Sequence, residues 1–169
     1  MAYGDDQISA NPVARFGWLA LGVGFYALGV LIPVVLAFVA LLAIRKLFPR
    51  LTEAAVFFSG LAVGQLLWFL LGAVFAPAMW LAVVPDLVIG GLLIGRFLAR
   101  PSPVPAALLM VFEAVGLAMN GWTLGEAGFA SPAAKVLIVH MLLRAAIVAS
   151  GVWYLTKRND VPVASEAFD

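Results

Sequence analysis

The sequence predicts an all-α integral membrane protein, a bundle of five transmembrane helices with the N-terminus outside and the C-terminus in the cytoplasm. Three observations predict this class: the composition, the length of the apolar runs and the placement of the basic residues. Of the 169 residues, 64% are hydrophobic and only 11% are charged, with a mean hydropathy of +1.09. Soluble proteins carry about 25% charged residues, so this composition is that of a membrane protein.

Apolar runs long enough to cross a bilayer recur along the chain. Crossing a hydrocarbon core about 30 Å thick takes about 20 helical residues. The first run is longer than that, so we expect Pro33 to kink it. It also exceeds a signal-peptide core of about 7–15 residues, and we expect it to remain as a signal anchor. An extracytoplasmic tail (1–16) precedes the predicted spans 17–44, 52–75, 81–98, 106–124 and 135–156, and a polar cytoplasmic tail (157–169) follows them.

Helix-boundary signals support several of these limits. Thr52 is a candidate cap for the second span, and Pro77 is expected to close it. Ser131 and Pro132 form a helix-start signal before the fifth span. In the third span, one interpretation is that regular helix begins only at Pro85, with residues 80–84 entering the membrane as extended or irregular backbone. Asp86 would then stand in a first helical turn for structural reasons alone.

The basic residues predict the orientation, because cytoplasmic loops are enriched in Lys and Arg. Only Arg15 and Lys135 fall on the predicted outer side. An odd number of spans is needed to place the remaining loop residues on one side, which supports five. These cytoplasmic residues are Arg45, Lys46, Arg50, Arg96, Arg100, Lys157 and Arg158.

Polar residues inside the predicted spans mark a candidate site. A charged residue at the centre of a span costs about 2.5–3.5 kcal/mol on insertion scales, so such groups usually pair or serve a function. Helix spacing places Glu113 and Asn120 on one face of the fourth span and His140 and Arg144 on one face of the fifth. Depths counted along the helices predict an outer layer of Asp86, Asn120 and His140 and a deeper layer of Tyr26, Gln65, Glu113 and Arg144.

Each of these residues has a structural and a functional interpretation. A Glu113–Arg144 ion pair is the simplest way to hold both charges near the midplane, either to fix helix packing or as part of a solute or proton site. His140 either donates one interhelical hydrogen bond, for example to Asn120, or accepts a proton near neutral pH. Two GxxxG pairs are expected to permit close helix packing, namely Gly60 with Gly64 and Gly91 with Gly95.

The sequence also narrows the class of function. A formal net charge of +1 gives no basic surface for nucleic acid, and one His with no Cys makes a zinc site improbable. No cofactor or metal is expected, and no catalytic motif is present, which leaves an intramembrane enzyme as a remote alternative.

Two classes remain. The first is a non-catalytic subunit or scaffold of a membrane assembly, associated with other membrane subunits or with itself. The second is a small transporter or proton or ion pathway that uses the polar cluster. For either class we expect a multi-pass protein in the lipid bilayer of a cell membrane, such as a bacterial inner membrane.

Overall fold

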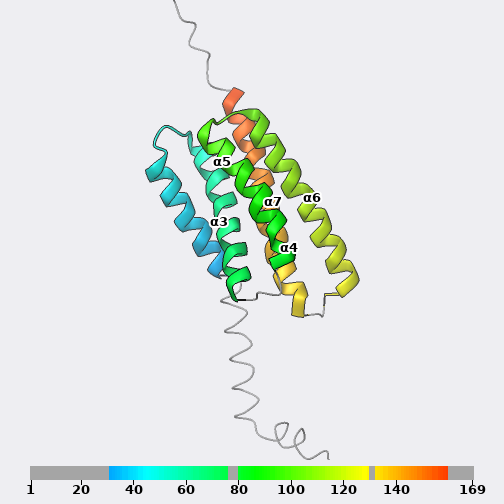
Figure 1. Cartoon of the computed structure of the whole chain (residues 1–169). Coiled ribbons are helices and arrows are strands. Elements are labelled where there is room, and N and C mark those ends of the chain that lie inside the picture. Colours follow the sequence, from blue (N-terminus) through cyan, green and yellow to red (C-terminus); the bar gives the residue numbers. More distant parts are fainter. Residues whose placement is uncertain (1–30, 76–79, 130–131, 160–169) are drawn as a thin grey trace, which may run out of the picture.

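The computed structural model describes residues 31–159, apart from 76–79 and 130–131. Every regular element in these described residues is helical, which confirms the all-α class (Figure 1). Residues 31–47 form the first described helix. The other elements are α3 (Glu53–Phe75), α4 (Trp80–Pro85), the π-helical segment η2 (Asp86–Gly90), α5 (Gly91–Ala99), α6 (Pro103–Ala127) and α7 (Pro132–Asn159).

Among the described residues, three helices are long and apolar enough to cross a membrane: Glu53–Phe75, Pro103–Ala127 and Ala134–Lys157. They correspond to the second, fourth and fifth predicted spans. The first predicted span is described only from residue 31 onward, so Tyr26 lies outside the described residues. The third is built from α4, η2 and α5 in succession.

Two local expectations are wrong. Residues 80–84 are not extended or irregular, because they form most of α4, and the helix continues through Pro85 in αR conformation. The irregularity instead follows Pro85, which has no backbone N–H to donate to the preceding turn, and it takes the form of the π-helical segment η2. Arg45 and Lys46 are not in a loop, since the first described helix runs to residue 47 and holds both cations at its C-terminal end.

The helix-start signals at Thr52 and Pro132 are used as the sequence predicts, whereas Ser131 lies outside the described residues. The Ala55 backbone N–H donates to Thr52 Oγ1 at 3.3 Å at the start of α3. Pro132 begins α7, in keeping with the preference for proline in a first turn.

Helix α3 occupies the middle of the bundle. It contacts α4, η2, α5 and α7, whereas α6 packs mainly on α7 and α5 and lies at the edge of the bundle (Figure 1). In the most apolar window of α3, 56% of residues are buried, compared with 22% for α6. One wide face of α6 is therefore left for lipid or for another protein.

The two glycine pairs have different surroundings. A Cβ on Gly64 would lie 2.4 Å from the Cα of Ala37, and one on Gly60 would lie 2.8 Å from the Cα of Leu41. Only glycine lets α3 approach the first described helix so closely. A Cβ on Gly91 would make an ordinary contact with Leu66, and one on Gly95 would meet nothing within 4 Å among the described residues.

Candidate functional site

A charge cluster lies in the middle of the bundle and is centred on Arg144 of α7. Its Nη1 donates to Glu113 Oε2 of α6 at 2.8 Å, so the ion pair expected between these residues is present. Its Nη2 donates to Asp86 Oδ1 of η2 at 2.5 Å. Gln65 of α3 completes the cluster, because its Nε2 donates to the same Glu113 oxygen at 2.9 Å. These four residues, which we call the charge cluster, join four elements.

The charge cluster is buried. Gln65 is 1% exposed, and Glu113 and Arg144 are each 3% exposed. The side chain of Asp86 is 20% exposed, so the cluster reaches the surface of the described bundle only through this carboxylate. Buried charges of this kind must be paired to be tolerated, and the geometry provides that pairing.

Gly116 makes room for the guanidinium. It lies one turn after Glu113 on α6, and a Cβ there would come within 2.3 Å of Arg144 Cζ. The guanidinium also lies near two rings, with Cζ 5.5 Å from the centroid of Phe69 and 6.0 Å from that of Phe112. A cation near ring faces gains further electrostatic attraction in a low-dielectric environment.

The charges of the cluster do not balance when all three groups are ionised, because two carboxylates share one guanidinium. Three buried polar atoms also have no hydrogen-bond partner among the described residues: Gln65 Oε1, Arg144 Nε and Asn120 Nδ2. Within the charge cluster, the acceptor Gln65 Oε1 and the donor Arg144 Nε therefore remain after its internal hydrogen bonds are made.

His140 belongs to a separate contact on the same helix as Arg144. Trp68 Nε1 donates to His140 Nε2 at 2.7 Å, which requires a neutral imidazole with its proton on Nδ1. The ring of Phe69 meets His140 edge to face at 5.0 Å. The contact that the sequence did not predict is this one, in which His140 accepts a hydrogen bond from Trp68.

Arg144 joins the two predicted layers. Asp86, which was expected in an outer layer with Asn120 and His140, has its carboxylate on the guanidinium of Arg144, a residue of the expected deeper layer. The long guanidinium-bearing side chain spans the difference in depth, which counting residues along helix axes ignores.

Sequence reasoning missed Trp68 and Phe69. Both follow Gln65 on α3 at spacings of three and four residues, which place side chains on one helix face. The sequence therefore did contain a signal for this contact surface, namely an amide and two aromatic residues on one face of an apolar helix.

Comparison with protein-family models, with curated proteins and with solved structures gives no match for this chain. Within the described residues there is also no group of three or more His, Cys, Asp or Glu side chains placed to hold a metal ion.

Proposed function

We propose that this protein is a small multi-pass membrane protein that acts as a non-catalytic subunit or scaffold of a membrane assembly. The observation that carries the proposal is that Arg144 uses both of its Nη atoms on carboxylates from two other elements, within a buried cluster. Charged side chains that pair with one another fix the register of the helices that carry them. Buried polar contacts of this kind are a known means of specifying how helices pack.

The surface of the bundle supports docking of further helices. Gly95 on α5 is open, and small residues on an exposed helix face permit close helix crossing in a bilayer. One face of α6 carries large exposed apolar side chains at helical spacing, which suits lipid tails or partner helices: Val104, Leu108, Val111, Val115, Met119 and Trp122.

The proposal includes five spans in a cell membrane of bacterial inner-membrane type, with the C-terminus in the cytoplasm. It is supported by the gathering of basic residues at one end of the bundle, where Arg50 and Lys157 line one cavity. Single cysteines at positions 4, 102 and 165 of this Cys-free chain test it. A membrane-impermeant thiol reagent added to intact cells should label only the first, and labelling at position 165 would refute the orientation.

A second candidate function, a proton or ion pathway, is favoured by the unbalanced charge of the cluster. A proton or small cation bound at Asp86 or Glu113 would neutralise it, and Asp86 is the partly exposed member. A π-helical segment such as η2 is frequent at functional sites, and Arg144 Nε and Gln65 Oε1 are a donor and an acceptor for a bound water molecule.

Two measurements separate these functions. Extraction from native membranes into lipid nanodiscs should give particles whose membrane-protein content exceeds one 17.9 kDa chain, and Gly95→Leu should reduce it to a single chain. Gly72→Leu on α3 is the control, because it lies outside α5 and α6 and a Cβ there also meets nothing within 4 Å among the described residues. Particles that contain a single copy of this chain and no other membrane protein would overturn the subunit proposal.

The second measurement uses proteoliposomes with a pH-sensitive dye inside. A subunit without a pathway should leave the vesicles as tight as empty ones. A proton leak that both Asp86→Asn and His140→Gln alter would instead support the pathway.

A further inference from the structure

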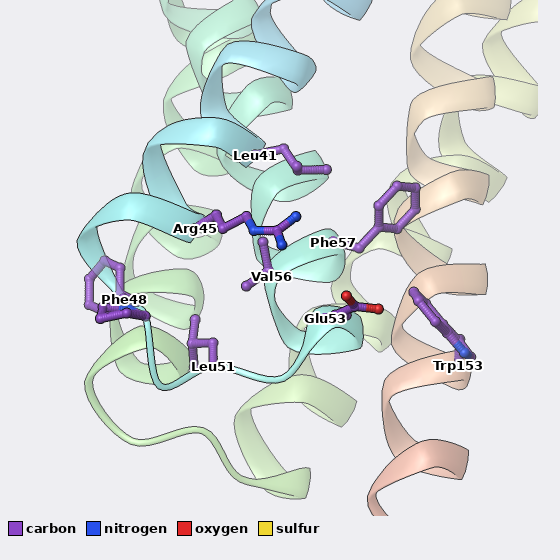
Figure 2. Close-up of a pocket in the computed structure, with 9 residues that line it drawn as sticks. Leu41, Arg45, Phe48, Leu51, Glu53, Val56, Phe57 and Trp153 are labelled. Carbon is purple, nitrogen blue, oxygen red and sulfur yellow. The ribbon is translucent and has the colours of Figure 1, made fainter.

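A cavity of about 360 Å³ lies at the basic end of the bundle, away from the charge cluster (Figure 2). Its walls come from the first described helix, the loop that follows it, α3 and α7. Glu53 of α3 lines it, and Gln65 of the charge cluster is 12 residues further along the same helix, about 18 Å at the helical rise of 1.5 Å per residue. The cavity is thus a distinct place in the molecule.

Two opposite charges enter this cavity from different helices. Figure 2 shows the guanidinium of Arg45 and the carboxylate of Glu53 directed into the same space. Both residues are exposed, and the ion pairs of the described residues involve neither of them. One cation and one anion therefore remain available to a ligand.

An aromatic residue borders the cavity next to Glu53. Trp153 of α7 is 41% exposed and packs against Phe57 with ring centroids 6.0 Å apart and planes at 77°. Tryptophan is the best aromatic partner for an ammonium group, and it is enriched at the interface between membrane and water.

The cavity becomes apolar toward the middle of the bundle. Leu41 precedes Arg45 by one helical turn, and Phe57 follows Glu53 by one turn. Phe57 is 42% exposed, so apolar surface continues from the cavity onto the side of the bundle. The site therefore combines two opposite charges with apolar surface, which suits an amphipathic molecule lying along a helix bundle.

We propose that this cavity binds a phospholipid whose head group joins a phosphate to an ammonium group, as in phosphatidylethanolamine. Arg45 contacts the phosphate, because the guanidinium fork matches its oxygens. Glu53 and Trp153 receive the ammonium, and the acyl chains run over Leu41 and Phe57. The net charge of the head group matches the net charge of the Arg45 and Glu53 pair.

A neighbouring cavity provides an internal comparison. It measures about 230 Å³, and its lining includes Arg50 and Lys157 but no acidic residue. A lipid with only a negative charge is suited to that cavity, whereas Glu53 repels it from the first one. The preference of the first cavity for a zwitterionic head group over an anionic one is therefore expected to depend on Glu53.

The test is lipid binding to the purified full-length chain in detergent, counted by native mass spectrometry. The probes are phosphatidylethanolamine, phosphatidylglycerol of the same acyl chains, and free phosphoethanolamine. The wild type should retain phosphatidylethanolamine, and Arg45→Gln and Glu53→Gln should each weaken retention about tenfold, the loss of one charged contact. Lys46→Gln, an exposed cation next to Arg45 that does not line the cavity, is the matched control and should leave retention unchanged.

The substitutions also predict a change of selectivity. Glu53→Gln should raise retention of phosphatidylglycerol relative to phosphatidylethanolamine, and Glu53→Asp should keep the wild-type preference. Equal retention of both lipids by the wild type, unaltered in Glu53→Gln, would overturn the proposal in favour of a general basic surface. Binding of free phosphoethanolamine as tight as that of the lipid would uphold the chemistry of the site but refute a lipid as its occupant.

Discussion

The charge cluster and the cavity at the basic end contain the same kinds of charged residue, but the residues have different roles in the two places. In the cluster, Arg144 is 3% exposed and bonded to two carboxylates from other elements. At the cavity, Arg45 and Glu53 share a space and are not paired with each other. A charge that is buried must be satisfied inside the protein, whereas a charge at a membrane interface keeps its capacity for a ligand.

A buried aromatic cluster lies between the two regions along α3. Phe58 of α3, Phe97 of α5 and Tyr154 of α7 are each at most 5% exposed, and their ring centroids lie 5.1–6.2 Å apart. Rings packed at this density form a rigid contact between α3, α5 and α7. Substitutions in one region should therefore leave the other unaffected.

The largest difference is expected between Arg144→Met and Arg45→Met. Removing the Arg144 guanidinium leaves Asp86 and Glu113 without their cation, and breaking a buried pair costs about 3–5 kcal/mol. Arg45→Met should leave stability within about 0.5 kcal/mol, as is usual for a surface substitution. Thermal and denaturant unfolding in detergent would measure both.

The two carboxylates refine this prediction. Glu113→Gln should cost less than Arg144→Met, because Asp86 still pairs with Arg144 and the cluster becomes neutral. If Glu113→Gln were the more destabilising of the two, the bond between Asp86 and Arg144 would not be what holds the cluster together.

The next largest effect concerns the glycines. Gly64→Ala should destabilise the bundle by about 1–3 kcal/mol, because the new Cβ would overlap the backbone of Ala37 and force the helices apart. It should also disturb the cavity, whose wall includes the first described helix, while Arg144 keeps its partners. Gly95→Ala is the control, since its Cβ meets only open space. Equal stabilities for the two variants would contradict the close approach of these helices.

Much of the fold was predictable because membrane-length apolar runs and helix-start residues are local signals. The limits of α3 follow from Thr52 and from the length of the run, and α7 begins at Pro132. The pairing of Glu113 with Arg144 was predictable because two lone charges in neighbouring spans have few alternatives.

Other features depend on tertiary contacts that no local pattern contains. The π-helical segment after Pro85 retains helical backbone where proline usually starts or ends a helix, and it packs against α3 on one side. Asp86 reaches the cluster through the length of the Arg144 side chain. Whether a glycine contacts another helix depends on which helix lies next to it. The same GxxxG spacing gives a tight contact at Gly64 but no contact at Gly95 among the described residues.

Crowding the cluster should have a moderate effect. Gly116→Ala places a methyl group against the Arg144 guanidinium, which is held by its ion pairs but lies at the end of a flexible side chain. We expect a loss of about 1–2 kcal/mol. Gly125→Ala on the same helix should be neutral or stabilising by up to about 1 kcal/mol, because alanine favours helix and the space is open. Destabilisation of both to the same extent would mean that the guanidinium does not occupy this position.

The smallest effect is expected at the contact between Trp68 and His140, and it bears on whether His140 serves packing or a pathway. Trp68→Phe keeps an aromatic ring but removes the indole N–H that His140 Nε2 accepts, so we expect a loss of about 1 kcal/mol. Trp122→Phe is the control, because Trp122 is 73% exposed on α6, and it should not change the melting temperature.

Combining Trp68→Phe with His140→Gln tests the bond itself. The loss in the double variant should be smaller than the sum of the two single losses, because both remove the same hydrogen bond. Additive losses would show that the two side chains act independently. His140 would then be free of Trp68, and the leak assay with His140→Gln would gain weight as the measure of its role.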